Sequence, residues 1–260
     1  MRTMSASERM SRVAMIPIAP ALIVQARRLR RTTLILPEAA RPWSGRAEST
    51  IDEARPLSLL VLGDSTAAGV GARTQDRALP GNLARDLAGR LQRPVDWRAF
   101  GESGITSREL IDRYLDDATA ASFDFAFLSI GANDALGLRS RGAFSRDVRT
   151  ILTRLRSASP EAVILMSSLP AFFRFELLPD PLRRTLYRHS RSLELGARAV
   201  VRDFGGAHMS PPPPPYTDGF FASDLFHPSE SGYRDWAEFA IADAATSGQL
   251  AQSGDGEETG

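Results

Sequence analysis

Cysteine and lysine are both absent from this chain of 260 residues, and only three histidines occur. Without cysteine the chain has no thiolate nucleophile, no disulfide, and no cysteine-bound zinc or iron–sulfur cluster. Without lysine it has no Walker-A phosphate-binding residue and no residue that forms a Schiff base with pyridoxal phosphate. Hydroxyl groups and carboxylates are the nucleophiles that remain, with few imidazoles to activate them.

A surplus of charge of one sign is also missing. The 32 arginines and 31 acidic residues give a formal net charge of +1, which argues against a surface dedicated to nucleic acid. His189, His208 and His227 are far apart in the sequence and form no H-E-x-x-H pattern. We therefore expect no histidine-based metal site and no nucleic-acid partner.

Residues 1–56 precede the first strand pattern and are interpreted as an N-terminal leader. The leader contains an apolar run at residues 13–24, which is followed by a cluster of arginines within residues 27–31. This run is too short to cross a bilayer as a regular helix. A helix that packs on the domain or contacts a membrane peripherally through residues 13–31 is ranked first, and a secretion signal second. A cytoplasmic or membrane-peripheral location is therefore favoured, with a secreted or periplasmic location as the alternative.

Strand and helix patterns alternate from residue 57 to residue 246, which predicts one α/β domain with a central parallel sheet of about five strands. The predicted strands are residues 57–62, 95–100, 125–130, 162–167 and 207–210. The predicted helices are residues 82–91, 108–118, 148–156, 185–203 and 230–245. In such a sheet the ligand site lies beyond the carboxyl ends of the strands.

Two segments stand apart from this alternation. The prolines at residues 211–215 are interpreted as a stiff loop brace in preference to a ligand for an SH3 domain. Residues 247–260 are polar, acidic and rich in glycine, and we expect a disordered tail there. The domain itself is accordingly expected to span residues 57–246.

The first predicted strand ends in the sequence Gly-Asp-Ser-Thr at residues 63–66. A serine in a turn after a strand can present its Oγ at the edge of the sheet, so Ser65 is a candidate nucleophile. Its own backbone N–H points into the same space, where it could donate to an oxyanion. The structural alternative is that the Asp-Ser pair only caps a helix.

Two further turns follow the second and third predicted strands. Gly104, in the sequence Gly-Glu-Ser-Gly-Ile-Thr at residues 101–106, could offer an unobstructed backbone N–H to an oxyanion. Taken alone, an ordinary glycine turn is the better explanation of that segment. Asn133, in the sequence Gly-Ala-Asn-Asp at residues 131–134, could donate its side-chain amide to developing negative charge or cap a helix.

An aspartate and a histidine lie near the end of the domain, in the sequence Ser-Asp-Leu-Phe-His-Pro-Ser at residues 223–229. A carboxylate three residues before an imidazole can turn back to its Nδ1–H and leave Nε2 free to face a hydroxyl. Asp224 and His227 are therefore candidates for the rest of a catalytic triad. The alternative is a histidine on an exposed loop, and the phenylalanines around it favour a partly shielded position instead.

Taken together, these four blocks resemble those of the GDSL, or SGNH, serine esterases in type and order, over most of the predicted domain. The resemblance implies a three-layer α/β/α, flavodoxin-like SGNH-hydrolase fold, and ester hydrolysis without a metal or cofactor. It assigns the nucleophile, the base and the carboxylate partner to Ser65, His227 and Asp224. It assigns the oxyanion hole to Ser65, Gly104 and Asn133.

Two positions depart from the family pattern. Thr66 follows the nucleophile where the family usually has leucine, a position at which the family itself varies. Ala99 and Phe100 occupy the part of the second block that usually carries an asparagine. Gly101 is therefore an alternative to Gly104 as the backbone donor, and Gly104 is preferred because Ser-Gly-x-Thr is a common form of the block.

The expected substrate is a small-molecule ester with a small or medium acyl group, cleaved through an acyl-enzyme. Residues 169–175 follow the fourth predicted strand, and their apolar side chains either line an acyl pocket or fill the core beneath the loop. Residues 178–183 resemble a segment of bacterial lysophospholipase-like GDSL esterases. An acyltransferase or a carbohydrate deacetylase with the same residues is the alternative. A non-catalytic binding module is less favoured, because it would not need all three triad residues.

Overall fold

The computed structural model of the chain describes residue 25, residues 34–49 and residues 55–251. The apolar run at residues 13–24 and the arginine cluster after it lie outside the described residues, as do residues 252–260. Among the described residues, no helix combines the length and the apolar character needed to cross a bilayer.

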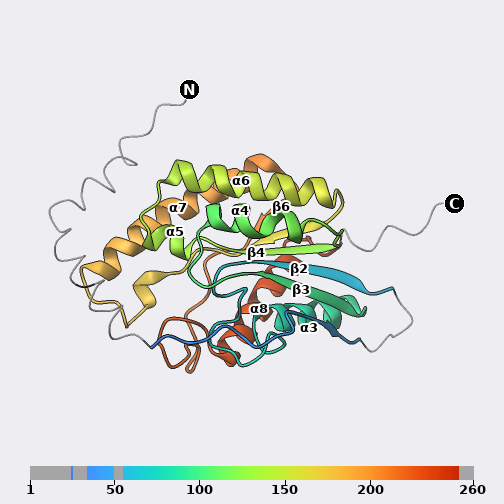
Figure 1. Cartoon of the computed structure of the whole chain (residues 1–260), viewed down its shortest axis with the longest axis horizontal. Coiled ribbons are helices and arrows are strands. Elements are labelled where there is room, and N and C mark those ends of the chain that lie inside the picture. The colour runs from blue at the N-terminus through green and yellow to red at the C-terminus, as the bar shows by residue number, and fades with distance from the viewer. Residues whose placement is uncertain (1–24, 26–33, 50–54, 252–260) are drawn as a thin grey trace.

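In the described part of the chain, six strands form one sheet in the order β1-β3-β2-β4-β5-β6 (Figure 1). The strands are β1 (Ser44–Ala47), β2 (Leu57–Gly63), β3 (Val95–Gly101), β4 (Phe125–Ser129), β5 (Val163–Met166) and β6 (Ala207–Met209). Neighbouring strands from β3 to β6 are parallel, as the sequence predicts, whereas β1 runs antiparallel to β3. The five parallel strands have the order of flavodoxin-like sheets, whose ligand site lies where the strand order reverses.

The sixth strand, β1, adds an edge to the five strands that the sequence predicts. It lies within the segment interpreted as a leader, and its sequence is Ser-Gly-Arg-Ala. It pairs with β3 from Ser44 opposite Arg98 to Ala47 opposite Val95, and only its last residue is buried. An exposed antiparallel edge strand needs no continuous apolar run, so the hydrophobic pattern did not indicate it.

Helices follow the parallel strands in the expected alternation. They are α3 (Leu79–Leu91), α4 (Ser107–Ala118), α5 (Ala132–Leu136), α6 (Arg141–Ala158), α7 (Leu182–Phe204) and α8 (Glu230–Thr246), with a 3₁₀ helix, η2 (Phe172–Arg174). The helices α3, α6 and α7 begin earlier than predicted, at Leu79, Arg141 and Leu182. Pro80 lies in the first turn of α3, and Ser140 caps α6 by accepting the N–H of Ala143.

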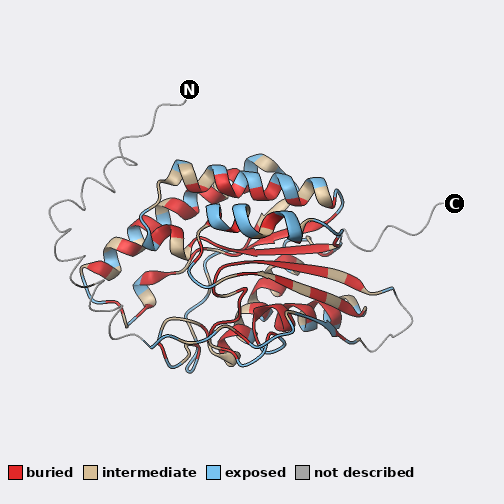
Figure 2. Ribbon diagram, viewed as in Figure 1, coloured by how far each residue is buried: buried red, intermediate tan, exposed pale blue. Residues whose placement is uncertain are grey.

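The helices cover both faces of the sheet and complete a three-layer sandwich, with α4, α5, α6 and α7 on one face and α3 and α8 on the other (Figure 1). Leu60 and Leu62 of β2 belong to the core beneath the first group of helices. Leu59 and Val61 belong to the core beneath the second group. Successive residues of β2 thus enter opposite cores, and Figure 2 shows buried residues along the strands and exposed ones on the outer helix faces.

Two glycines bring the carboxyl ends of the central strands close together. Gly63 of β2 lies opposite Gly101 of β3 and opposite Ser129 of β4. A Cβ atom at Gly63 would lie 2.1 Å from the carbonyl oxygen of Ser129, and one at Gly101 would lie 2.3 Å from that of Gly63. This glycine pair lets the turns after β2, β3 and β4 begin side by side.

The chain stays packed for several residues beyond α8. Leu250 is buried in the core formed by α3 and α8, and the backbone N–H of Gln249 donates to the carbonyl of Ala244 at 2.9 Å. Residues 247–251 of the expected tail are therefore part of the folded domain, because Leu250 contributes apolar surface to its core.

Candidate active site

Ser65 lies in a tight turn directly after β2, and its exposed fraction is 7%. Its carbonyl oxygen accepts the N–H of Val70 at 2.9 Å. The hydroxyl of Tyr233 on α8 donates to the carbonyl of Val70 at 2.7 Å, which ties the turn to that helix. Ser65 caps no helix, because the next helix, α3, begins only at Leu79.

His227 connects Ser65 to Asp224. Its Nε2 lies 3.0 Å from the Oγ of Ser65, and its Nδ1 lies 2.6 Å from the Oδ2 of Asp224. Asp224 and His227 come from the loop before α8, more than 150 residues after the serine in the sequence. The loop turns back through Leu225, whose φ of +55° lies in the left-handed region. The fold thus brings together the three side chains that the sequence singles out.

Asp224 is buried, and every hydrogen bond to it comes from the histidine loop. Its Oδ1 accepts the backbone N–H groups of Phe226 and His227, both at 3.0 Å. Burial by itself raises the pKa of this carboxyl, but the hydrogen bonds from the His227 ring and from the two backbone groups outweigh it. The pKa of Asp224 is therefore below its ordinary value, and the carboxylate is ionised at neutral pH.

The turn after β3 presents Gly104 on an open surface. Its φ is +89°, and a Cβ built on it would meet no atom within 4 Å. The backbone conformation, and not crowding, is therefore what requires glycine there. Gly101, the alternative donor, is the last residue of β3 and faces Gly63 in the sheet. Of the two candidates, Gly104 is the one that lies in a turn.

Asn133 lies in α5, directly after β4, and its side chain reaches the neighbouring turn. Its Nδ2 donates to the carbonyl of Ile105 at 3.0 Å, so it holds the residue that follows Gly104. A primary amide has two N–H groups, and this bond uses one of them. The N-cap of α5 is Gly131 and has no side-chain cap hydrogen bond, so Asn133 is not the helix cap.

A buried acidic pair, Asp134 and Asp147, supports these turns, and the sequence analysis did not single it out. Asp134 accepts the backbone N–H and the hydroxyl of Ser107 at 2.9 Å and 2.7 Å. Arg139 forms ion pairs with Asp134 at 3.3 Å and with Asp147 at 2.5 Å. Burial raises the pKa of Asp134, and the Ser107 hydrogen bonds and the Arg139 charge oppose the shift. The network fixes the start of α4, directly after the Gly104 turn.

Asp64, the residue before Ser65, is buried in a network of hydroxyl groups. Its carboxylate accepts the N–H and the hydroxyl of Thr66 at 3.2 Å and 3.3 Å. The Oγ1 of Thr66 lies 2.8 Å from the Oγ of Ser129, which lies 3.4 Å from the Oγ of Ser167. Burial raises the pKa of Asp64 to about 6, against the Thr66 hydrogen bonds and the charge of His227. The threonine that departs from the family pattern thus links Asp64 to the ends of β4 and β5.

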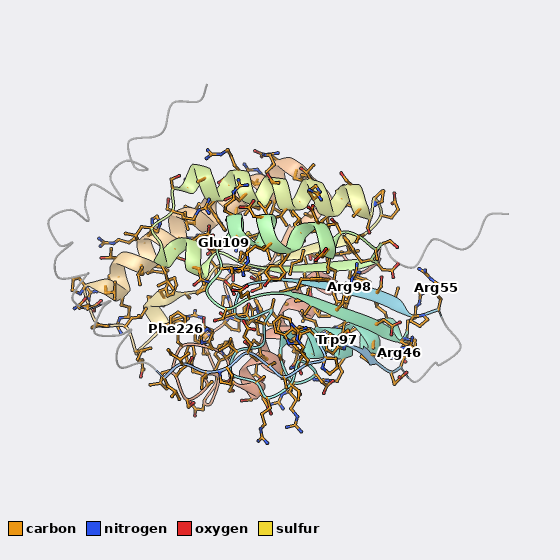
Figure 3. All side chains as sticks on the ribbon, viewed as in Figure 1. Arg46, Arg55, Trp97, Arg98, Glu109 and Phe226 are labelled. Atoms are coloured by element: carbon orange, nitrogen blue, oxygen red, sulfur yellow. The ribbon has the colours of Figure 1, made fainter. Side chains whose placement is uncertain are left out.

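An apolar cleft opens beside Ser65 and His227. The loop after β5, the proline loop, the loop before α8 and α8 itself form its walls. Its apolar lining includes Leu169, Phe175, Phe221, Phe226, Trp236 and Phe239. Phe226, labelled in Figure 3, packs beside the His227 ring with centroids 5.2 Å apart. Such a lining suits a hydrocarbon or aromatic group and disfavours a charged one.

Residues 169–175 serve both of the roles that the sequence analysis weighed. Leu169 and Phe175 line the cleft, whereas the ring of Phe172 is fully buried in the core. The sequence analysis missed the α8 wall, although Trp236 and Phe239 are three residues apart. Apolar residues at helical spacing are equally typical of a face packed on the core, so that spacing could not distinguish a cleft wall.

The other two histidines lie outside this site. The Nε2 of His208 on β6 lies 2.6 Å from the Oδ2 of Asp243 on α8, and His189 is buried in α7. Over the described ranges, no group of three or more histidine, aspartate or glutamate side chains is arranged to hold a metal ion.

Comparisons with known proteins agree with this fold and these motifs. The model of the GDSL-like lipase/acylhydrolase family matches residues 61–234. A GDSL-like esterase of Mycobacterium tuberculosis is 28% identical over 203 residues, which are 73% of this chain and 63% of the relative. The chain therefore matches less than two thirds of that relative's length.

Two solved structures share the fold at low sequence identity. The extracellular lipase of Streptomyces rimosus has a TM-score of 0.56 and 15% identity, and the match covers 72% of this chain and 99% of that one. The lipase/acylhydrolase of Enterococcus faecalis has a TM-score of 0.56 and 19% identity, with 74% and 96% covered. At these identities the likeness establishes the three-layer fold, and the chemistry has to be argued from the residues.

Proposed function

The chain belongs to the GDSL-like lipase/acylhydrolase family, and from this premise we propose that it is a carboxylic ester hydrolase with Ser65 as nucleophile. The observation that carries the proposal is the position of His227, 3.0 Å from the Oγ of Ser65 and 2.6 Å from the carboxylate of Asp224. A serine hydroxyl is a weak nucleophile by itself. An imidazole that a buried carboxylate holds at hydrogen-bond distance from the hydroxyl is the arrangement that activates it.

In this mechanism His227 accepts the proton of Ser65 on Nε2 as the Oγ attacks the ester carbonyl carbon. Its Nδ1–H remains donated to Asp224, whose negative charge stabilises the imidazolium that forms. The imidazolium gives its proton to the departing alcohol as the ester C–O bond breaks, which leaves an acyl-enzyme. Water, deprotonated by the same imidazole, then hydrolyses the acyl-enzyme and restores Ser65.

We assign the oxyanion to the backbone N–H groups of Ser65 and Gly104 and to the second N–H of Asn133. The support for Gly104 is its open turn, in which no side chain covers the backbone. The support for Asn133 is its bond to Ile105, because that bond holds the amide against the same turn. Donors that are fixed before the reaction need no reorganisation when negative charge develops on the carbonyl oxygen.

The apolar cleft supports neutral esters with a small or medium acyl group as substrates. Aromatic and aliphatic side chains line it next to Ser65 and His227, so an acyl chain attached to the serine has an apolar surface to contact. Each methylene group buried there contributes about 0.8 kcal/mol to binding. A charged acyl group would lose its hydration in the same cleft without gaining a partner.

The decisive experiment measures p-nitrophenyl butyrate hydrolysis by Ser65→Ala, His227→Ala and a matched control, Ser157→Ala. Ser157 is an exposed serine on α6, so its loss removes a hydroxyl without touching the cleft. We expect the first two variants to keep their fold and lose turnover by up to about 10⁶-fold, and the control to keep wild-type turnover. A folded Ser65→Ala protein with near-wild-type turnover would refute the proposal.

The same assay separates hydrolysis from acyl transfer. In the presence of an acceptor alcohol, a hydrolase releases the free acid at an unchanged rate. An acyltransferase accelerates p-nitrophenol release and forms the new ester, because the alcohol replaces water as the second nucleophile. Formation of that ester as the main product would identify the protein as an acyltransferase and not a hydrolase, with the same roles for Ser65 and His227.

A further inference from the structure

The proline loop at residues 211–215 forms one wall of the cleft. Pro213, Pro214 and Pro215 all line it, although the loop has no regular secondary structure. Proline has no N–H, so these residues can form hydrogen bonds only through their carbonyl oxygens. Hydrogen bonds from donors elsewhere in the chain to those oxygens therefore tie the wall to the rest of the domain.

Arg174, at the end of η2, supplies these donors. Its Nη1 donates to the carbonyl of Pro213 at 2.8 Å and to that of Pro214 at 2.6 Å. The guanidinium carbon lies 5.1 Å from the ring centroid of Phe173 and 5.5 Å from that of Tyr216, so aromatic faces border the charge. Among the described residues, Pro213 and Pro214 line the cleft and Arg174 does not. The arginine therefore lies behind the proline wall.

Tyr216, the residue that follows the prolines, joins the same two segments a second time. Its ring lies 6.3 Å, centroid to centroid, from that of Phe175, the residue after Arg174. Burial raises the pKa of its hydroxyl to about 12, and the positive charge of Arg174 opposes that shift. Its ring stacks on Phe220 with centroids 4.2 Å apart. Thr217 ties the same loop to α8, because its hydroxyl donates to the carboxylate of Asp235 on that helix at 2.6 Å.

We propose that Arg174 is a specificity-determining positioning residue, which sets the acyl-chain length that the cleft accepts by holding the proline wall in place. This inference rests on the proposed ester hydrolysis and adds to it the residue that fixes one wall of the acyl site. Both bonds come from Nη1, and the rigid guanidinium plane fixes the directions of its two N–H groups. The ammonium group of lysine is a flexible, strongly hydrated point charge, so it would have to bridge the two carbonyls without that fixed plane. A wall fixed in this way discriminates between chains that differ by a few methylene groups.

The dependence on chain length is what distinguishes this role from general stabilisation. An acetyl group extends one carbon beyond the ester carbonyl and stays beside Ser65 and His227. A hexanoyl or octanoyl group must run along the wall of the cleft. Loss of the arginine should therefore affect the long esters and spare the short one.

The test compares kcat/KM for p-nitrophenyl acetate, butyrate, hexanoate and octanoate in the wild type, Arg174→Met and Arg174→Lys. We expect Arg174→Met to change the ratio between the preferred long ester and acetate by about tenfold, a typical discrimination for a methylene group in an apolar pocket. The value for acetate itself should stay within about twofold of the wild type on the same argument. Arg174→Lys should fall between the two, because it keeps the charge and loses the bridging geometry.

The matched control is Arg98→Met. Arg98 on β3 also donates to two backbone carbonyls, those of Ala118 and Ala121, and its guanidinium carbon lies 5.9 Å from the ring centroid of Phe100. Figure 3 shows Arg98 on the sheet, away from the cleft residue Phe226. The control should lower the melting temperature without changing the chain-length preference. If Arg174→Met does not fold, Pro214→Gly loosens the same wall and gives the same comparison.

Each outcome decides between the alternatives. A change in the chain-length ratio with Arg174→Met, and none with Arg98→Met, supports the inference. An equal loss on all esters, or an unchanged ratio, overturns it while ester hydrolysis stands. A wild-type protein that hydrolyses no ester would instead overturn the proposed function.

Discussion

Asn133 has two side-chain N–H groups, and the carbonyl of Ile105 already binds one of them. We predict that the other acts in the transition state. An interaction made mainly there lowers turnover when it is lost and hardly changes the Michaelis constant. Asn133→Ala should therefore lower kcat by about 10²-fold to 10³-fold, with KM close to that of the wild type. Steady-state kinetics measure the changes in kcat and KM separately.

A second variant separates this role from that of a purely structural amide. Asn133→Asp keeps the size of the side chain but places a carboxylate beside the oxyanion, so it should be no more active than Asn133→Ala. If the amide only holds the Gly104 turn, Asn133→Ala should lose about 1 kcal/mol of stability and keep most of its turnover. A thermal melt together with kcat distinguishes the two outcomes.

Asp64 gives the site a pH dependence of stability. Burial raises the pKa of Asp64 to about 6, so the folded protein binds a proton that the unfolded chain, with a carboxyl pKa of about 3.9, has released. Stability from this group is therefore present below about pH 4 and is lost as the pH rises through about 6. We predict that Asp64→Asn is more stable than the wild type at pH 8, by up to about 3 kcal/mol.

Urea unfolding at several pH values tests this prediction. The difference in unfolding free energy between Asp64→Asn and the wild type should shrink as the pH falls through the range of the carboxyl's titration. Asp117→Asn, which removes an exposed carboxyl on α4, should show no such trend. If the unfolding free energies of the wild type and Asp64→Asn differ by the same amount at every pH, the raised pKa of Asp64 is contradicted.

Local motifs made the candidate catalytic residues predictable, whereas the side chains that support them were not predictable. Ser65 was found because glycine and serine follow an apolar strand, and Asp224 and His227 because three residues separate them. The link from Asp64 through Thr66 to Ser129 joins residues more than 60 positions apart, and each is an ordinary polar residue in its own segment. Pairing across strands leaves no periodic signal in the sequence.

At the scale of elements, α4 and α5 meet through one buried carboxylate. Asp134 on α5 binds the backbone N–H and the hydroxyl of Ser107 at the start of α4. We predict that Asp134→Ala destabilises the protein by about 3 kcal/mol, because it leaves the buried partners of the carboxylate uncompensated. It should also lower kcat, since the Gly104 turn leads directly into α4. Chemical unfolding and steady-state kinetics measure the two effects.

The control for that variant lies on the neighbouring helix, α4, which Asp134 holds through Ser107. Asp112→Ala removes an exposed carboxylate of α4 that pairs with Arg108 at 3.6 Å. Such a surface pair contributes little, so the change in unfolding free energy should stay below about 0.5 kcal/mol. Equal stability losses for Asp112→Ala and Asp134→Ala would show that the buried network does not hold the turn.

Most elements with an apolar periodicity were predicted to within a few residues, although α6 begins at Arg141 and not at the predicted residue 148, and the elements without such a periodicity were missed. β2 and β4 are continuous apolar runs buried from both faces. β1 has no such run, and only its hydrogen bonds to β3 define it as a strand. The short helix α5 is too brief to show a helical period, so its segment was recognised only as the Gly-Ala-Asn-Asp block.

At the scale of the whole molecule, strand–helix alternation predicted one domain with a central parallel sheet, and the resemblance to the GDSL esterases implied its three layers. The alternation could not predict which loops meet over the active site, because the proline loop and α8 approach the cleft from separate parts of the chain. The sequence likewise could not predict where the leader contacts the domain. Gln25, a leader residue that the structure describes, shows one such contact. Its side chain donates to the carbonyl of Asp180 at 2.9 Å and accepts the N–H of Leu182 at 3.2 Å.

These contacts place one point of the leader at the start of α7, and we predict that the leader stays on the mature protein. The apolar run and arginines of residues 13–31 should contact an anionic membrane surface. Deletion of residues 1–33 should therefore abolish sedimentation with phosphatidylglycerol vesicles, while ester hydrolysis in solution is kept. Mass spectrometry of the protein from its native host provides the opposing outcome, because a mature N-terminus near residue 27 would indicate a cleaved secretion signal.

The glycine pair has a consequence for mutational scanning of this enzyme. Any side chain at Gly63 or Gly101 would collide with a backbone carbonyl of the neighbouring strand. A library scored by ester turnover alone would therefore rank both positions with the proposed triad, although neither glycine carries a side chain that could react. Scoring the amount of folded protein in parallel separates them, since triad variants stay abundant and glycine variants do not. Libraries that aim at new esters should leave the strand ends unchanged and vary the proline loop and α8.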